Sequence, residues 1–307
     1  MIALPKNPYP PLELAKFIYK IFHPQYGSDL DANNGQQHWQ ISKTPLTPTA
    51  TIGFVGDILP VRKRKMQFDP AIIEFFSDCD YLIGNFEGII SDQPAFFFIQ
   101  KHSTAILDQL ATIKPLNQWY LSLANNHAMD FGVEGFNNTK RFIQERGANV
   151  FGDKENPSIN LPQNIVIDTW TQWVNGKTDL VEQSPRLATG LSPSMQDKTL
   201  HIAYPHWGYE FESMPRVEQL VNIPLHYDLI VGHHPHFVQP IQRTPDSLIA
   251  WSLGNFTTEI KRKLMHEGRL LKSLIGLNSA GLPRIDWVKS KNIRLEVEKT
   301  TVHSKPL

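Results

Sequence analysis

Side chains that can bind metal ions follow five short apolar runs in this 307-residue sequence. The runs cover residues 51–56, 80–84, 119–124, 200–205 and 228–232, and the polar residues after them are Asp57, Asn85 with Glu87, Asn125 to His127, His206, and His233, His234 and His236. Apolar runs of this length are typical of buried strands. Open α/β sheets collect their ligands beyond the carboxyl ends of the strands. The repeated pattern therefore predicts one convergent metal site.

Composition limits the chemistry of that site. Six of the twelve histidines lie between residues 201 and 236, namely His201, His206, His226, His233, His234 and His236. Cys79 is the single cysteine, so it cannot form an intrachain disulfide or a thiolate metal site, and the ligands must be nitrogen and oxygen atoms. Thirty basic and thirty acidic residues argue against a nucleic-acid partner.

The elements that must position these residues alternate along the chain. We expect helices at residues 12–22, 70–76, 132–146 and 215–221, with Asp69 capping the second helix and Gly147 ending the third. After residue 247 the pattern predicts strands at 248–254, 269–277, 284–289 and 293–302, with a hairpin turn at 278–281. This order predicts an α/β sandwich of two sheets.

The N-terminal region differs from the rest of the chain. Residues 1–49 are rich in proline and polar side chains and predict an extension and linker before one domain at 50–303. The helix at 12–22 is expected to pack on that domain, with a membrane or partner anchor as the alternative. The sequence has no secretory-signal pattern and no run of about 18 apolar residues that could span a bilayer. We expect a cytoplasmic protein, and envelope association through peripheral membrane contact stays open.

The motifs around the ligand-type residues resemble a known family. They are GDILPVR at 56–62, IGNFEG at 83–88, LANNHAMDFG at 123–132, HWGYEF at 206–211, GHHPHFVQPI at 232–241 and WSLGNF at 251–256. Together they resemble the poly-γ-glutamate capsule-biosynthesis protein CapA family, a branch of the calcineurin-like metallophosphoesterases. The resemblance implies a four-layer αββα sandwich of two mixed sheets, with the site at the sheet edge. Residues 153–198 match poorly and are expected to lack the apolar strand of the family.

The same resemblance implies a ligand set for two divalent metal ions. The expected ligands are Asp57, Asn85, Glu87, Asn126, His206, His234 and His236. Oxygen and imidazole donors suit Mn²⁺, Fe²⁺ or Zn²⁺. Leu59 occupies a position where the wider superfamily has a histidine, and Asn85 stands at or near its bridging aspartate, so Glu87 is the expected substitute. His233 stands where relatives have glycine, which favours a packing or supporting role over ligation.

Five further residues are candidates for catalysis or substrate binding. By resemblance His127 is the general acid, and Asp130 either orients it or caps the helix that follows. Arg62 either contacts an anionic substrate or belongs to a solvated charged loop with residues 63–65. Glu210 and Asn255 match family motifs and are expected near the substrate.

Three functions compete on this sequence. The first is a metal-dependent hydrolase of a phosphoester or a related small anionic substrate, in which two metal ions about 3.5–4 Å apart clamp the displacement at phosphorus. The second is a capsule or envelope polymer factor that binds an anionic chain such as polyglutamate with little turnover. The third is a metal-poor relative, because Leu59 removes one ligand.

Overall fold

The computed structural model describes residues 8–23, 37–94, 96, 98–176, 178–183, 198–221, 227–245 and 247–307. His226, one of the clustered histidines, lies outside these ranges. The five helices of the described chain are α1 (Pro11–Phe22), α2 (Pro70–Phe75), α3 (Ala105–Leu110), α4 (Gly132–Glu145) and α5 (Val217–Val221), with short 3₁₀ turns at Leu116–Gln118 and Lys263–Met265. The four predicted helices correspond to α1, α2, α4 and α5.

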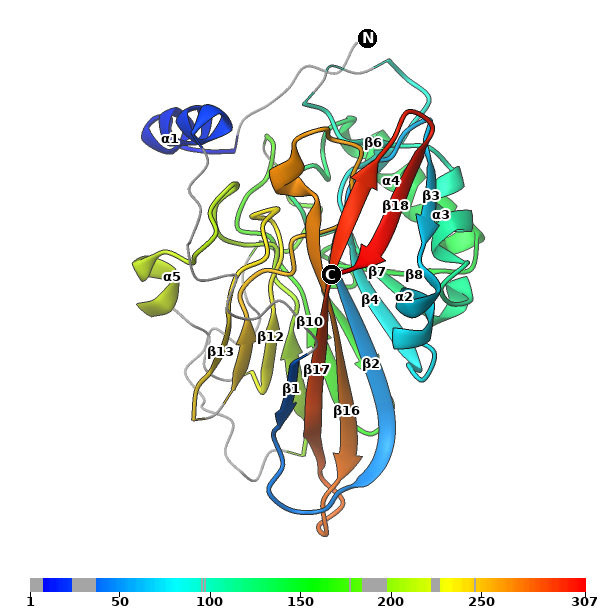
Figure 1. Cartoon of the computed structure of the whole chain (residues 1–307), viewed down its shortest axis with the longest axis vertical. Helices are drawn as coiled ribbons and strands as arrows, with labels where there is room; N and C mark the ends of the chain where they lie inside the picture. Colours follow the sequence, from blue (N-terminus) through cyan, green and yellow to red (C-terminus); the bar gives the residue numbers. More distant parts are fainter. Residues whose placement is uncertain are drawn as a thin grey trace.

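A ten-stranded mixed sheet forms the centre of the molecule (Figure 1). Its strands run in the order β3 (Lys65–Phe68), β18 (Thr301–Pro306), β17 (Pro283–Val297), β16 (Glu267–Leu277), β2 (Thr47–Ile58), β4 (Tyr81–Phe86), β7 (Trp119–Ser122) and β8 (Asn149–Phe151), with β1 (Gln37–Gln40) on β17 and β15 (Asn255–Thr257) on β2. The strands from β2 to β8 are parallel, whereas β16 pairs antiparallel with both of its neighbours.

A second, six-stranded sheet packs against the first. Its order is β13 (Ile241–Arg243), β14 (Leu248–Ala250), β12 (Leu229–Val231), β11 (Leu200–Ala203), β10 (Ile165–Asp168) and β9 (Ser158–Leu161). A small parallel pair, β5 (Ile89–Ile90) and β6 (Lys101–His102), lies apart from both sheets. The protein is therefore a mixed α/β structure with two large sheets.

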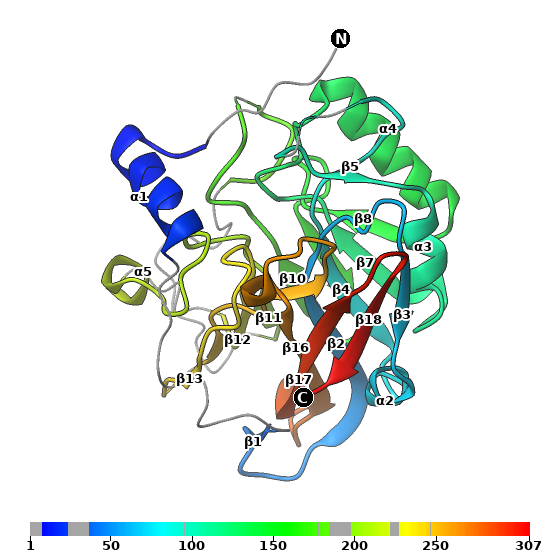
Figure 2. The ribbon, with the colours of Figure 1, turned by 45° about the horizontal axis from the view of Figure 1, so that its top comes forward.

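Two hydrophobic clusters hold the layers together. One lies between the sheets and includes Phe54 of β2, Ile83 of β4 and Ile167 of β10, all fully buried. The other joins the opposite face of the large sheet to α2, α3 and α4, through residues such as Phe76 and Phe136. Figure 2 shows these three helices on one side of the molecule and α1 with α5 on the other.

Local capping explains where two helices begin and end. Asp69 accepts a hydrogen bond from the backbone N–H of Ala71 at 2.9 Å, and Pro70 opens α2, as expected. Gly147 follows α4 with a φ of +91°, a left-handed conformation that glycine adopts without steric strain. Both local predictions are confirmed.

Two expectations about strands are wrong. Residues 153–198 do contain an apolar strand, because β10 has the sequence IVID and pairs in parallel with β11. The strand was missed because only Ile165 and Ile167 of its four residues are fully buried hydrophobics. The strands expected at 284–289 and 293–302 are instead one long strand, β17, followed after a turn by β18. Strand β16 pairs with the polar residues 290–292 and so carries β17 through them.

The region expected to be an extension contributes to the fold. β1 lies within residues 1–49 and pairs antiparallel with β17, with His38 opposite Lys289. β2 also begins at Thr47, before the expected domain start. None of the described helices is long and apolar enough to cross a membrane.

We predict that β10 is a core element of the fold. Ile167→Ala should lower the free energy of unfolding by about 2–5 kcal/mol, because it empties a buried site between the sheets. Val166→Ala, on the half-buried face of the same strand, is the matched control and should have a smaller effect. Urea denaturation of both variants measures the difference, and equal losses would contradict the placement of β10.

Candidate metal centre

Strand pairing brings the first two predicted ligands side by side. β2 and β4 are parallel, and their register places Asp57 directly opposite Asn85. On the other side of β2, Asn255 of β15 also pairs with Asp57. Asn85 Nδ2 donates a hydrogen bond to Asp57 Oδ1 at 2.8 Å. Asp57 and Asn85 each lie one position before the end of their strand. They were expected to follow the strands, but they belong to the sheet.

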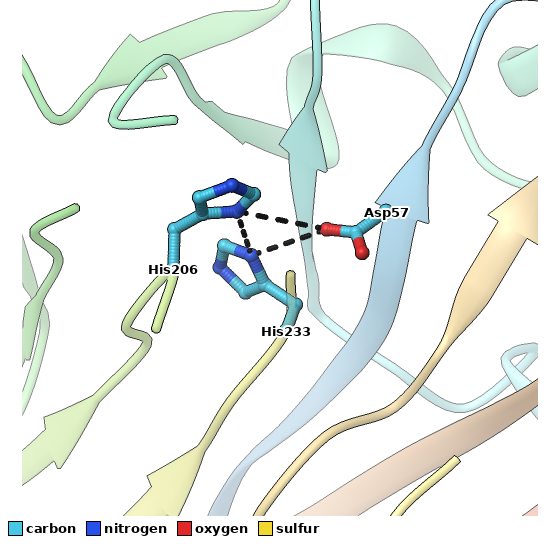
Figure 3. A group of neighbouring side chains, drawn as sticks. All are labelled: Asp57, His206 and His233. Atoms are coloured by element: carbon cyan, nitrogen blue, oxygen red, sulfur yellow. Dashed lines mark hydrogen bonds and ion pairs between the residues drawn. The ribbon is translucent and has the colours of Figure 1, made fainter. Parts of the chain in front are cut away.

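The second sheet supplies the histidines. His206 and His233 follow β11 and β12, and a parallel bridge pairs them. Their Nδ1 atoms are 2.8 Å apart and lie 3.8 Å and 3.2 Å, respectively, from Asp57 Oδ1 (Figure 3). The carboxyl edges of the two sheets therefore meet at Asp57.

A tight loop after β12 carries the other two histidines. His234 and His236 have φ values of +106° and +60°, a region that L-residues rarely adopt. The backbone N–H of His234 donates to Asp57 Oδ2 at 3.1 Å, and His236 Nδ1 lies 3.1 Å from the same oxygen. Contacts with one buried carboxylate thus hold the loop in its unusual conformation.

The two central carboxyl groups have opposite pKa shifts. Burial would raise the pKa of Asp57, but hydrogen bonds from His233 and His236 outweigh it and hold the pKa well below its usual value. Burial, together with the charges of Asp57 and Glu210, raises the pKa of Glu87 well above its usual value. Within the described chain, both carboxylates form ion pairs with histidines and not with lysine or arginine.

Two buried groups among the described residues could hold a metal ion. The first is Asp57, His206 and His233, and the second is Asp57, Glu87 and His236. In the first group the two imidazoles hydrogen-bond to each other, so their facing nitrogens are satisfied without an ion. In the second group Glu87 Oε1 has no hydrogen-bond partner among the described residues, and it lies 3.7 Å from His236 Nε2. A cation would neutralise this buried carboxylate, so the second group fits a metal ion better.

A third set of donor atoms lies beside these groups. Asn126 Oδ1 is 3.0 Å from His206 Nε2, and the ring centroids of His206 and His234 are 4.3 Å apart. His234 Nδ1 is buried and has no hydrogen-bond partner in the described part of the chain. Burial lowers the pKa of both histidines well below the usual value, so each ring stays neutral and keeps a lone pair for a metal.

His127 faces this cluster from the loop after β7. Its Nδ1 lies 2.7 Å from Asp130 Oδ2, and its Nε2 lies 3.9 Å from Glu87 Oε1. Asn175 Nδ2 donates to Asp130 Oδ1 at 3.2 Å, which holds the carboxylate in place. The N-cap of α4 is Phe131, so Asp130 contacts His127 and does not cap the helix.

The remaining candidates differ in their distance from the cluster. Glu210 Oε1 accepts a hydrogen bond from Asn126 Nδ2 at 3.3 Å, and Asn255 Oδ1 lies 3.1 Å from His236 Nδ1. Arg62 is 41% exposed at its side chain and forms an ion pair with Glu259 at 3.1 Å. Leu59 is buried with Phe211, Phe237 and Met265, so it fills a hydrophobic cluster and offers no ligand atom to the centre.

Sequence reasoning missed some residues of the cluster. Asn125 Nδ2 donates to Asn85 Oδ1 and to the Phe86 carbonyl oxygen, a role that its place beside Asn126 could have suggested. His233 contacts Asp57 directly, which fits the packing or supporting role that its sequence position favoured. Tyr9 hydrogen-bonds to His234 from the N-terminal region, which no motif indicates.

The fold and the site define an α/β protein with a buried carboxylate–histidine centre that could bind a metal. The family model "Bacterial capsule synthesis protein PGA_cap" matches residues 51–168 and 165–259, and the chain belongs to this family. The resemblance to CapA is confirmed. The chain is similar to "PGA biosynthesis protein CapA" of Bacillus subtilis (strain 168), with 28% identity over 70% of this chain and 64% of the relative. It is also similar to "Capsule biosynthesis protein CapA" of Bacillus anthracis, with 26% identity over 67% of this chain and 59% of the relative.

The matches span less than two thirds of both curated relatives. Among solved structures, a hypothetical protein from Thermus thermophilus aligns with a TM-score of 0.45 and 12% identity, over 77% of this chain and 97% of that protein.

We predict that Glu87 destabilises the metal-free protein and stabilises the metal-bound protein. Glu87→Gln should raise the melting temperature without metal near neutral pH, because it removes a buried carboxylate whose pKa is raised on folding. At a free Mn²⁺ concentration of a hundred times Kd, the free energy of unfolding of the wild type should rise by about 2.7 kcal/mol. That of the variant should rise much less.

Differential scanning fluorimetry with and without Mn²⁺ measures both effects. Glu134→Gln, an exposed position on α4, is the matched control. An equal response of the wild type and Glu87→Gln to Mn²⁺ would exclude Glu87 as a ligand.

Proposed function

We propose that the protein is a metal-dependent hydrolase that cleaves a phosphoester or a related small anionic substrate. The observation that carries the proposal is the buried Glu87 Oε1, which has no hydrogen-bond partner among the described residues. It lies 3.7 Å from His236 Nε2 and 3.9 Å from His127 Nε2. An unsatisfied carboxylate oxygen beside two imidazoles fits a bound cation and an adjacent acid–base group.

Two sets of residues would hold the metal ions. Asp57, Glu87 and His236 would hold one ion, and Asn126, His206 and His234 the other, with Asn85 bonded to Asp57 beside them. Bound Mn²⁺, Fe²⁺ or Zn²⁺ would polarise the substrate and lower the pKa of a water nucleophile. The match to the CapA family and the chemistry of the donor atoms support this assignment.

His127 is the proposed general acid. Asp130 would accept a hydrogen bond from the Nδ1–H of the His127 imidazolium, which orients the ring. Nε2 then faces the cluster and can donate its proton to the leaving oxygen. Glu210 and Asn255 act through Asn126 and His236, respectively, so we now propose that they position ligands instead of binding substrate. Arg62 remains a proposed substrate contact, available if its bond to Glu259 opens.

We further propose that the fold is the four-layer sandwich of the metallophosphoesterases. Helices α2 to α4, the ten-stranded sheet and the six-stranded sheet would be three of its layers. The fourth would cover the aromatic cluster on the outer face of the small sheet, which includes Trp170, Trp207 and Trp251.

A second candidate function is a capsule or envelope polymer factor that binds a polymeric anion such as polyglutamate with little turnover. The names of the Bacillus relatives favour it, since both refer to PGA or capsule biosynthesis. Slow or absent hydrolysis together with micromolar binding of polyglutamate would support this candidate. Leu59, a buried hydrophobic side chain without a ligand atom, is the observation behind the third candidate, a metal-poor relative.

We predict that His127→Ala lowers kcat for phenyl phosphate by about 10²–10⁴-fold in the presence of Mn²⁺. The loss should be much smaller for p-nitrophenyl phosphate, because its leaving group departs without a proton. His303→Ala, on β18, is the control and should behave as the wild type.

The comparison of the two substrates tests the role of His127, and the activity of the wild type tests the hydrolase function itself. Equal losses on both substrates would argue against a general acid at His127. A wild-type chain that binds Mn²⁺ but hydrolyses neither these monoesters nor bis-p-nitrophenyl phosphate would overturn the hydrolase proposal and leave polymer binding as the better account.

A further inference from the structure

The N-terminal segment reaches the candidate metal centre. Tyr9 precedes α1 and lies far outside the residues that match the family, 51–259. Its hydroxyl lies 2.9 Å from His234 Nε2, and the side chain is buried. A residue from the expected extension therefore contacts an expected metal ligand.

Aromatic packing fixes the ring of Tyr9 in this position. Its centroid lies 4.9 Å from that of Trp173 in an edge-to-face arrangement, and 6.3 Å from that of Tyr209. Phe17 of α1 lies 5.6 Å away and also stacks on Phe211, whose centroid is again 5.6 Å distant. The hydroxyl is thus directed at His234 by rings from three separate parts of the chain.

Buried ion pairs hold α1 against the site. Lys20 pairs with Glu212, and both side chains are more than nine-tenths buried. Arg216 bridges Glu212 and Glu13, with distances of 2.7 Å and 2.8 Å. Arg262 Nη2 donates to the carbonyl oxygen of Lys20 at 3.1 Å. Because Glu212 lies two residues after Glu210, these contacts join α1 to the loop that lines the centre.

The contact with Tyr9 bears on which ring nitrogen of His234 carries the proton. A neutral ring carries one N–H and one lone pair, and the partner of one nitrogen decides which atom has the proton. Ligating histidines usually donate their other N–H to an oxygen, which fixes the tautomer and the ring orientation. His234 has such an oxygen at Nε2, whereas its Nδ1 is buried and unpartnered among the described residues.

We propose that Tyr9 is a positioning residue for His234. Its hydroxyl accepts the Nε2–H, so that the lone pair of Nδ1 is presented to a metal ion. The tautomer proposed for His234 does not depend on the proposed function, whereas the role of its Nδ1 in metal binding rests on it. The N-terminal segment then belongs to the site and is more than a linker.

Histidine NMR of the metal-free protein tests the tautomer directly. Long-range ¹H–¹⁵N correlation spectra distinguish the two tautomers, and His234→Asn identifies the signal of His234. We expect the Nε2–H form in the wild type and a mixture of both forms in Tyr9→Phe. Tyr19→Phe removes an exposed hydroxyl from the same segment and should match the wild type. An Nδ1–H form in the wild type, or no change in Tyr9→Phe, would overturn the proposal.

Calorimetric titration with Mn²⁺ tests the consequence for the metal. Tyr9→Phe should weaken one of two binding events by about 10–100-fold and leave the other unchanged, while Tyr19→Phe changes neither. Unchanged or tighter binding by Tyr9→Phe would refute the positioning role. A wild type that binds no Mn²⁺ would instead overturn the proposed function, and the NMR result would then decide on Tyr9 alone.

Discussion

The site depends on the hydrogen bonds that the carboxylate of Asp57 accepts. This carboxylate is fully buried, and it accepts hydrogen bonds from Asn85 on the neighbouring strand and from the backbone of His234 in the loop after β12. His233 and His236 lie 3.2 Å and 3.1 Å from its two oxygens. Without these donors a buried carboxylate would be strongly unfavourable. The same contacts fix where the two sheets meet and how the histidine loop is shaped.

This arrangement leaves an imbalance of charge that a cation would correct. Asp57 is satisfied by its donors, but Glu87 is buried beside it, and its Oε1 accepts no hydrogen bond in the described chain. The raised pKa of Glu87 reflects burial first and the neighbouring carboxylates second. Proteins retain such groups where function needs them, since a neutral side chain would be more stable. At the candidate metal centre the buried Glu87 carboxylate therefore lowers the stability of the fold but provides a possible ligand for a cation.

Much of the site could be predicted from the sequence because its residues follow buried strands. Parallel pairing brings the ends of β2 and β4 together, so Asp57 and Asn85 had to be neighbours once the strands were recognised. Contacts that depend on tertiary packing could not be predicted in this way. Only Ile165 and Ile167 of strand β10 are fully buried hydrophobics, so its pattern is weak. The approach of Tyr9 to His234 depends on ion pairs of α1 that no local pattern encodes. Arg62 was expected either at the substrate or in a solvated charged loop, and its ion pair with Glu259 is a contact that charge alone does not predict.

Anomalous diffraction at the manganese edge, from crystals soaked in Mn²⁺, is the most direct test of the metal centre. We expect one peak bounded by Asp57, Glu87 and His236, and a second beside Asn126, His206 and His234. A protein that binds no manganese would contradict this assignment, and so would a single peak among Asp57, His206 and His233.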